Sequence, residues 1–88
     1  MGLVKKTIQI TIKLFSGLHS DSGIGGYDPE EGVVMMVKAG TRVRKIAKEM
    51  GLPDYRNLAY FVGGIKAGHR ARLKDGDELV CLRPSAGG

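Results

Sequence analysis

The segment from residue 4 to residue 15, VKKTIQITIKLF, most constrains the fold because its hydrophobic side chains alternate with polar ones. A repeat of two residues is typical of a β-strand with one buried face, and β-branched residues favour strands. We therefore predict a half-buried strand here, with one apolar face made by Ile8, Ile10, Ile12 and Leu14.

Further strand and turn signals follow in the second half of the chain. VVMMVK at 33–38 predicts a second strand, and LAYFV at 58–62 predicts a third. Gly63-Gly64 predicts a tight turn into a short return strand that begins IKA. Asp75-Gly76 predicts a turn before a closing strand at 78–82, which Pro84 ends because proline has no amide hydrogen for a ladder.

One segment between these strands has helical spacing. Thr41 is the expected N-cap, its hydroxyl accepting from an amide of the first turn. Gly51 is expected to end the helix, and Pro53 precedes a link, DYRN. The apolar stripe of the helix is Val43, Ile46, Ala47 and Met50.

The element order predicts an α+β domain in which one helix covers one face of a mixed sheet of four to five strands. The aliphatic first and last strands are expected side by side in the centre. Residues 16–32 hold five glycines and a proline, which predict a long loop. The segment fits neither phosphate-binding glycine pattern, so we expect a mobile connector rather than a phosphate site.

Composition bounds the function. The 88 residues make one domain, and no apolar run approaches the roughly 20 residues that span a bilayer. With no signal peptide and a single cysteine, we expect a cytoplasmic protein without membrane contacts. The net charge is +5, but no aromatic residues interleave with basic runs, so we expect an acidic protein partner and no nucleic acid.

The basic residues of the helical segment lie off its apolar stripe. Cations near a helix N-terminus oppose the helix dipole, which suggests an external reason for their placement. They are ordinary solvent-facing charges or contacts to an acidic partner, and the set is Arg42, Arg44, Lys45 and Lys48.

Side chains that could do chemistry are sparse. His19 and His69 are far apart in sequence and have no metal-ligand spacing, so we expect no metal site. Cys81 is expected to be a packed strand cysteine. An acidic cluster is explained by the Asp-Gly turn, and its members are Asp75, Asp77 and Glu78. With no nucleophile–base pair, the isolated chain is expected to catalyse nothing.

The last residues are unusually small. Arg83 to Gly88 would reach roughly 20 Å when extended at about 3.3 Å per residue. We predict a domain over 1–83 and a flexible arm over 84–88, with Arg83 as a candidate partner contact. Glycine has no Cβ, so the arm could thread a narrow channel; its residues are Pro84, Ser85, Ala86, Gly87 and Gly88.

Four motifs together resemble the ubiquitin-like sulfur-carrier family, which includes the molybdopterin synthase small subunit and the thiamine-biosynthesis sulfur carrier. They are A-G-T-x-V-x-x-I-A-x-x-x-G-L-P from Ala39, F-V-x-G from Phe61, L-K-D-G-D-E-L from Leu73 and P-x-A-G-G from Pro84. Two departures are Val62-Gly63-Gly64, where the family commonly has V-N-G, and the glycine-rich stretch, where molybdopterin synthase subunits usually have a short helix.

The resemblance implies the β-grasp fold and a carrier that works at its C-terminus. A ubiquitin-activating-type enzyme would adenylate the carboxylate of Gly88 with ATP, and sulfur would displace AMP to leave a thiocarboxylate. Gly87, which has no Cβ, would let the backbone approach the nucleotide closely in the narrow channel where the acyl-adenylate forms. The sulfur acceptor would be the large subunit of molybdopterin synthase or a thiazole synthase, and no cofactor would be bound permanently.

Three hypotheses follow for the function. The first is a sulfur carrier, most similar to the molybdopterin synthase small subunit, with the thiamine-type carrier as an alternative. The second is a ubiquitin-like modifier that is joined to lysines of other proteins. The third is a β-grasp module that binds nucleic acid through its basic face.

Overall fold

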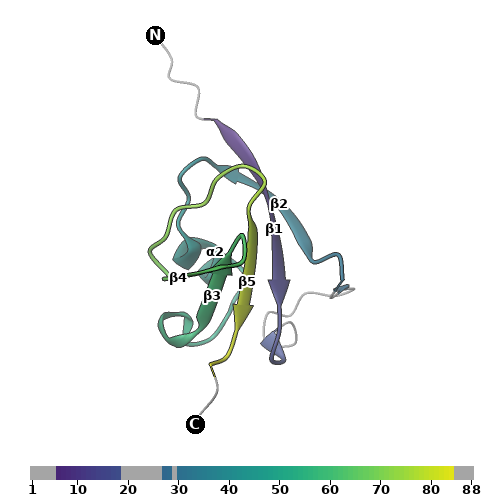
Figure 1. Ribbon diagram of the computed structural model, residues 1–88, viewed down its shortest axis with the longest axis vertical. Coiled ribbons are helices and arrows are strands. Elements are labelled where there is room, and N and C mark those ends of the chain that lie inside the picture. The colour runs from purple at the N-terminus through teal and green to yellow at the C-terminus, as the bar shows by residue number, and fades with distance from the viewer. Residues whose placement is uncertain (1–5, 19–26, 29, 85–88) are drawn as a thin grey trace.

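The protein, represented by a computed structural model, is described over residues 6–18, 27–28 and 30–84. The predicted strands and the predicted helix are confirmed within these residues (Figure 1). The elements are β1 (Thr7–Leu14), β2 (Val33–Lys38), α2 (Val43–Glu49), the 3-10 helix η1 (Tyr55–Asn57), β3 (Ala59–Val62), β4 (Ile65–Ala67) and β5 (Glu78–Leu82).

These strands form one sheet in the order β2-β1-β5-β3-β4. β1 pairs parallel with β5, whereas the other neighbours pair antiparallel. In the parallel pair Thr11 lies opposite Glu78 and Leu14 lies opposite Cys81. The prediction that the first and last strands lie side by side within a mixed sheet is therefore confirmed.

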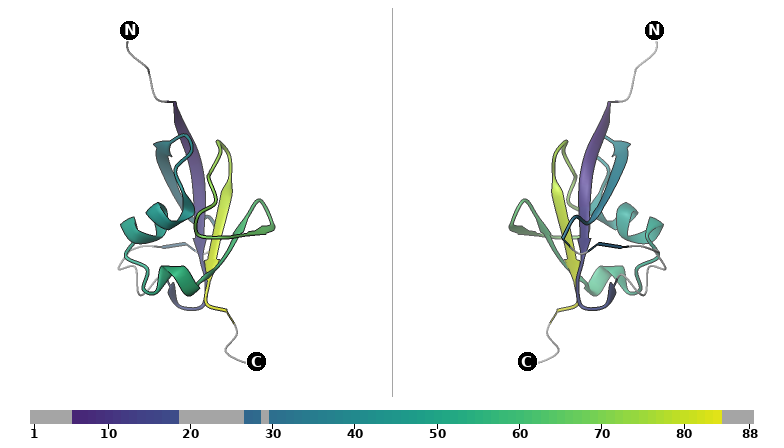
Figure 2. Two further views of the ribbon diagram at one scale, coloured as in Figure 1. Left: turned by 90° about the vertical axis from the view of Figure 1, so that its left-hand side faces the viewer. Right: turned by 90° about the vertical axis from the view of Figure 1, so that its right-hand side faces the viewer.

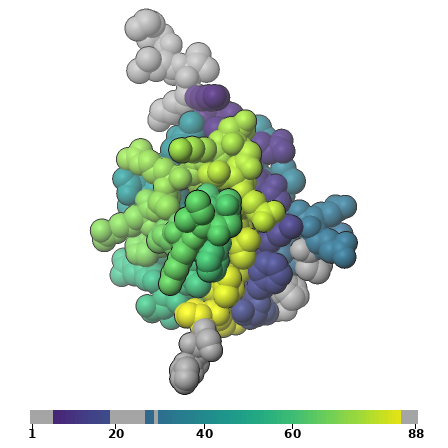
Figure 3. Space-filling view, viewed as in Figure 1, coloured from purple at the N-terminus to yellow at the C-terminus, as the bar shows by residue number. Residues whose placement is uncertain are grey.

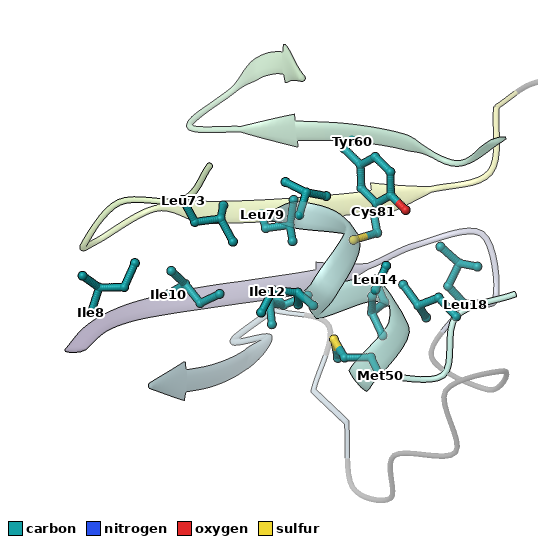
Figure 4. Close-up of a cluster of buried hydrophobic side chains, with 14 residues drawn as sticks. Ile8, Ile10, Ile12, Leu14, Leu18, Met50, Tyr60, Leu73, Leu79 and Cys81 are labelled. Carbon is teal, nitrogen blue, oxygen red and sulfur yellow. The ribbon is translucent and has the colours of Figure 1, made fainter. Parts of the chain in front are cut away.

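The buried core lies between one face of this sheet and the helices (Figure 2). The four predicted aliphatic side chains of β1 form one row and are at most 2% exposed (Figure 4). Tyr60 of β3 and Leu79 of β5 join this row. The predicted stripe of α2 is buried against the sheet, with Ile46 fully enclosed. Burial of a side chain of this size contributes about 1.5–3 kcal/mol to folding.

The start of α2 corrects one prediction. The N-cap residue is Arg42 rather than Thr41, and no side chain caps the helix. The Thr41 hydroxyl instead donates to the Lys38 carbonyl oxygen at 2.6 Å. Because this hydroxyl is used in the turn that follows β2, it does not reach the first amides of the helix.

Main-chain carbonyls of a distant loop take the place of that cap. The Val43 amide donates to the Ala71 carbonyl at 2.9 Å, and the Arg44 amide donates to the His69 carbonyl at 2.7 Å. The first helical amides have no partner within the helix, so these bonds satisfy them. The loop is thereby fixed against the helix.

The end of α2 agrees with the prediction that Gly51 ends it. Gly51 has a φ of +72°, and its amide donates to the Lys48 carbonyl at 3.0 Å. The Leu52 amide donates to the Ala47 carbonyl at 3.0 Å. This pair of bonds is the Schellman motif, which needs a left-handed residue that glycine adopts without strain.

Two connecting segments differ from the sequence-based expectation. Leu18 is helical and fully buried, so the prediction of a connector without secondary structure over 16–32 is wrong at this residue. Residues 19–26 and 29 lie outside the described part. The expected link DYRN contains the 3-10 helix η1, which begins after Asp54 in a left-handed conformation. The predicted division into a domain over 1–83 and an arm over 84–88 stays a prediction.

We predict that Gly76→Ala lowers the free energy of unfolding by about 1–2 kcal/mol, the cost of a left-handed conformation for a residue with a Cβ. Gly76 has a φ of +85° in the Asp75-Gly76 turn, and a Cβ built there meets nothing within 4 Å. Urea denaturation measures the loss.

Gly68→Ala is the matched control. A Cβ at Gly68 also meets nothing within 4 Å, but its φ lies outside the left-handed range. The control is expected to leave stability unchanged or slightly increased. Equal losses in the two variants would contradict the assignment of the cost to backbone conformation.

Candidate functional site

The end of β5 places the predicted arm. β5 lies between β1 and β3, and its last antiparallel pair is Leu82 with Ala59. The Phe15 amide also donates to the Cys81 carbonyl at 2.9 Å, so the strand is held on both sides almost to its end. Arg83 and Pro84 follow and are exposed. The chain therefore leaves the centre of the sheet at one end of the molecule (Figure 1).

The residues expected to carry the chemistry lie beyond this point. Ser85, Ala86, Gly87 and Gly88 fall outside the described residues, so their roles stay predictions. Pro84 is the last described residue, and it lacks the amide that would extend the ladder.

Arg83, directly after β5, is held by a hydrogen bond to the end of β1. Its Nη1 donates to the carbonyl oxygen of Ser16 at 3.0 Å. Ser16 has a φ of +59°, in the turn that follows β1. This bond ties the residue after β5 to the end of β1 and leaves the charged group at the surface, where a partner can reach it.

An apolar surface that the sequence-based predictions did not include lies beside the end of β5, on the outer face of the sheet. In register, Val80 lies opposite Phe61 and Leu82 lies opposite Ala59; we call these four residues the exit face. All four are only partly buried, because α2 and η1 lie on the other side of the sheet. Figure 3 views this outer side, with β5 running between β1 and the β3–β4 hairpin.

A sequence signal for the exit face was present. In ELVCL the inward residues Leu79 and Cys81 alternate with Val80 and Leu82, which are also apolar. A strand that is apolar on both faces is either buried on both sides or presents a surface to a partner.

The basic residues of the helical segment are not part of this exit. Arg42 donates from Nη1 to the Arg70 carbonyl at 3.3 Å, and Lys45 pairs with Glu49 at 3.8 Å. Arg44 is partly buried. They belong to α2 and its N-cap, on the opposite side of the sheet from the exit face. The structure therefore does not bring them together with Arg83 in one surface.

The acidic cluster is used by the turn before β5. Asp75 accepts from the Gln9 amide at 2.8 Å, and Asp77 accepts from the Lys74 amide at 2.7 Å. Glu78 pairs with Lys13 of β1 at 3.3 Å. These contacts account for the three carboxylates without any catalytic role.

The remaining candidates have structural surroundings. Burial raises the pKa of the Cys81 thiol to about 12. Desolvation lowers the pKa of His69, and nearby Arg70, Arg44 and Arg56 lower it further. His19 lies outside the described residues. Within the residues that the structure describes, no group of three or more His, Cys, Asp or Glu side chains could hold a metal ion.

Comparisons with known proteins identify the fold. No protein-family model matches the sequence, and no curated protein matches it. The structure is similar to the solution structure of the HVO 2177 protein of Haloferax volcanii, with a TM-score of 0.72 and 17% identity over 100% of this chain and 93% of that one. This chain has the β-grasp fold of ubiquitin-like proteins.

Two further solved structures share this fold. One is a putative molybdopterin converting factor subunit 1 from Pyrococcus furiosus, with a TM-score of 0.64 and 17% identity over 89% of this chain and 99% of that one. The other is small archaeal modifier protein 1 of Haloferax volcanii, with a TM-score of 0.64 and 19% identity over 89% of this chain and 99% of that one. Among the described residues, no helix has the length and hydrophobicity needed to cross a bilayer.

We predict that the Cys81 thiol of the folded protein reacts with iodoacetamide at pH 8 about a thousandfold more slowly than the thiol of the unfolded chain. A rise of the pKa from 9.0 to about 12 reduces the thiolate fraction by that factor, and the thiolate is the nucleophile. Mass spectrometry of alkylated protein, with and without guanidinium, gives both rates. Similar rates in the two states would show an accessible, reactive thiol.

Proposed function

We propose that this chain is a ubiquitin-like sulfur carrier. A partner enzyme adenylates the carboxylate of Gly88, releasing pyrophosphate from ATP, and a sulfur nucleophile then displaces AMP to leave a thiocarboxylate. The observation that carries the proposal is the exit of the central strand β5 at Arg83 and Pro84, directly beside an apolar face. The β-grasp fold supports it.

The division of labour follows from acyl chemistry. A carboxylate is a poor electrophile, so it must be activated as a mixed anhydride with AMP before sulfur can replace an oxygen. The thiol and the turn carboxylates considered above do not serve that step, since Cys81 is buried and the carboxylates of the Asp75-Gly76 turn are engaged. In this proposal a partner enzyme binds ATP and catalyses the adenylation, and this chain supplies the substrate.

In this proposal the exit face, Arg83 and the small residues after Pro84 have separate roles. The exit face would dock on the partner, because its four partly buried apolar side chains lie next to the exit of β5 and a partner would cover them. Arg83 would direct the arm, since its guanidinium is bonded to Ser16 at the edge of that face. The small residues after Pro84 would then enter a channel too narrow for the domain.

The pathway that receives the sulfur is proposed by likeness. The shared fold with a putative molybdopterin converting factor subunit favours a molybdopterin synthase small subunit, whose large subunit would accept the sulfur. A thiazole synthase would be the acceptor for a thiamine-type carrier.

A second candidate function is protein modification. The shared fold with small archaeal modifier protein 1 favours it, because the same activated glycine could be attacked by a lysine amine instead of sulfur. The two functions share the adenylation step and differ in the nucleophile that displaces AMP.

We predict that protein isolated from its native cells contains a species whose intact mass is higher by the replacement of one oxygen with sulfur. Fragmentation mass spectrometry should place the change on Gly88. Deleting Gly88 should abolish it, because the remaining chain no longer places its carboxylate at the required reach. Cys81→Ala is the control and should retain it, since Cys81 is buried and takes no part.

Two outcomes would count against this proposal. Lysine-linked adducts through Gly88 without any thiocarboxylate would favour the modifier. Absence of both products when the cognate activating enzyme and ATP are supplied would refute activation at Gly88.

A further inference from the structure

A second surface, on the helix side of the sheet, gathers positive charge around an aromatic pair. The rings of Tyr55 and His69 meet edge to face, with centroids 5.8 Å apart and planes at 82°. Lys48 lies over the Tyr55 ring at 5.2 Å, and Arg56 lies over it at 5.6 Å. We call this surface the basic cluster; its residues are Arg44, Lys48, Tyr55, Arg56, His69 and Arg70.

The four cations of the cluster are not neutralised. In the part of the chain that the structure describes, none of them forms an ion pair, whereas nearby Lys45 pairs with Glu49. Arg70, Arg44 and Arg56 all act on His69 and help to lower its pKa, after desolvation. Like charges held close together without a counterion cost free energy, so an anionic ligand would relieve the cost.

The cluster is held in place by contacts from three segments. The Arg44 amide donates to the His69 carbonyl at 2.7 Å, which fixes the loop against α2. The Tyr60 hydroxyl donates to the Tyr55 carbonyl at 2.6 Å, which fixes η1 against the sheet. The main chain that carries the charged groups is therefore fixed, and only the side chains need to be ordered when a ligand binds.

The shape of the cluster favours an extended ligand. Arg44 and Lys48 are one helical turn apart, about 6 Å along the axis. Alternate side chains of an extended peptide are about 6.6 Å apart, so successive carboxylates on one side would match them. An open hollow beside the cluster is lined by Asp54, Tyr55, Arg56 and Asn57. The Asp54 carboxylate would repel any anionic group placed in the hollow, so the carboxylates of the ligand are expected over α2 rather than there.

The aromatic pair disfavours nucleic acid as the ligand. Single-stranded nucleic acids stack their bases on open aromatic faces. The Tyr55 ring already carries Lys48 and Arg56, and the His69 ring packs against it. Charge pairing is what the cluster offers, without base stacking.

We propose that the basic cluster binds an extended, acidic segment of a partner protein. Two of its cations, Arg44 and Lys48, were singled out in the sequence for an acidic partner. The other two residues of the predicted basic set, Arg42 and Lys45, have partners within the chain. Arg56 and Arg70 belong to the cluster in their place. The site is separate from the exit face, so it does not depend on the sulfur-carrier function.

The test uses a short oligo-glutamate peptide as the probe and the full chain labelled with nitrogen-15. Amide shift changes should centre on the basic cluster, and His69 should titrate at higher pH with peptide bound, because carboxylates stabilise its protonated form. The double variant Arg56→Glu, Arg70→Glu should bind about tenfold more weakly or worse. Both residues are exposed, so the fold should be retained.

The control changes the net charge equally at a distance from the cluster. Lys38→Glu, Lys74→Glu alters two exposed lysines and should weaken binding less than threefold, roughly the effect of long-range charge alone. Equal losses in the two double variants would overturn the proposal, since binding would then follow net charge. Tighter binding of a single-stranded oligonucleotide at the same residues would also overturn the assignment of an acidic protein segment.

Discussion

The parallel pairing of β1 with β5 organises both the core and the surface of this protein. It joins residues from the two ends of the chain, with Leu14 opposite Cys81, and it places β5 between two neighbours. The aliphatic face of β1 can then meet Leu79 and α2 in one core. The same pairing puts the end of β5 in the middle of the sheet, so the core and the exit face both depend on it.

The two faces of the sheet are specialised by what covers them. The inner face is closed by α2, whose first amides bond to the carbonyls of His69 and Ala71. That arrangement closes the core and also presents the basic cluster on the outside of the helix layer. The outer face keeps Val80 and Phe61 partly exposed next to the exit. The domain thus presents an apolar surface beside the end of β5 and a positively charged surface on its other side.

Much of the fold could be predicted because local patterns decide it. Alternation identified the buried face of β1, and the spacing of Val43 to Met50 identified the buried face of α2. Predictions failed where a distant partner competes with a local one. Thr41 has the chemistry of an N-cap, but loop carbonyls cap the helix. Leu18 lies in a glycine-rich stretch that predicts a connector, yet it is part of the core.

Local sequence pattern was enough to predict which residues turn inward, where the main turns fall and that small residues follow Pro84, because side-chain period and backbone preference act over a few neighbours. The surfaces could not be predicted in this way, because they depend on contacts between distant segments. The exit face requires the register of β3 with β5, and the basic cluster requires α2, η1 and the loop at His69 to meet. Those contacts join residues far apart in the chain, and their alignment is set by burial of the whole core rather than by any local pattern.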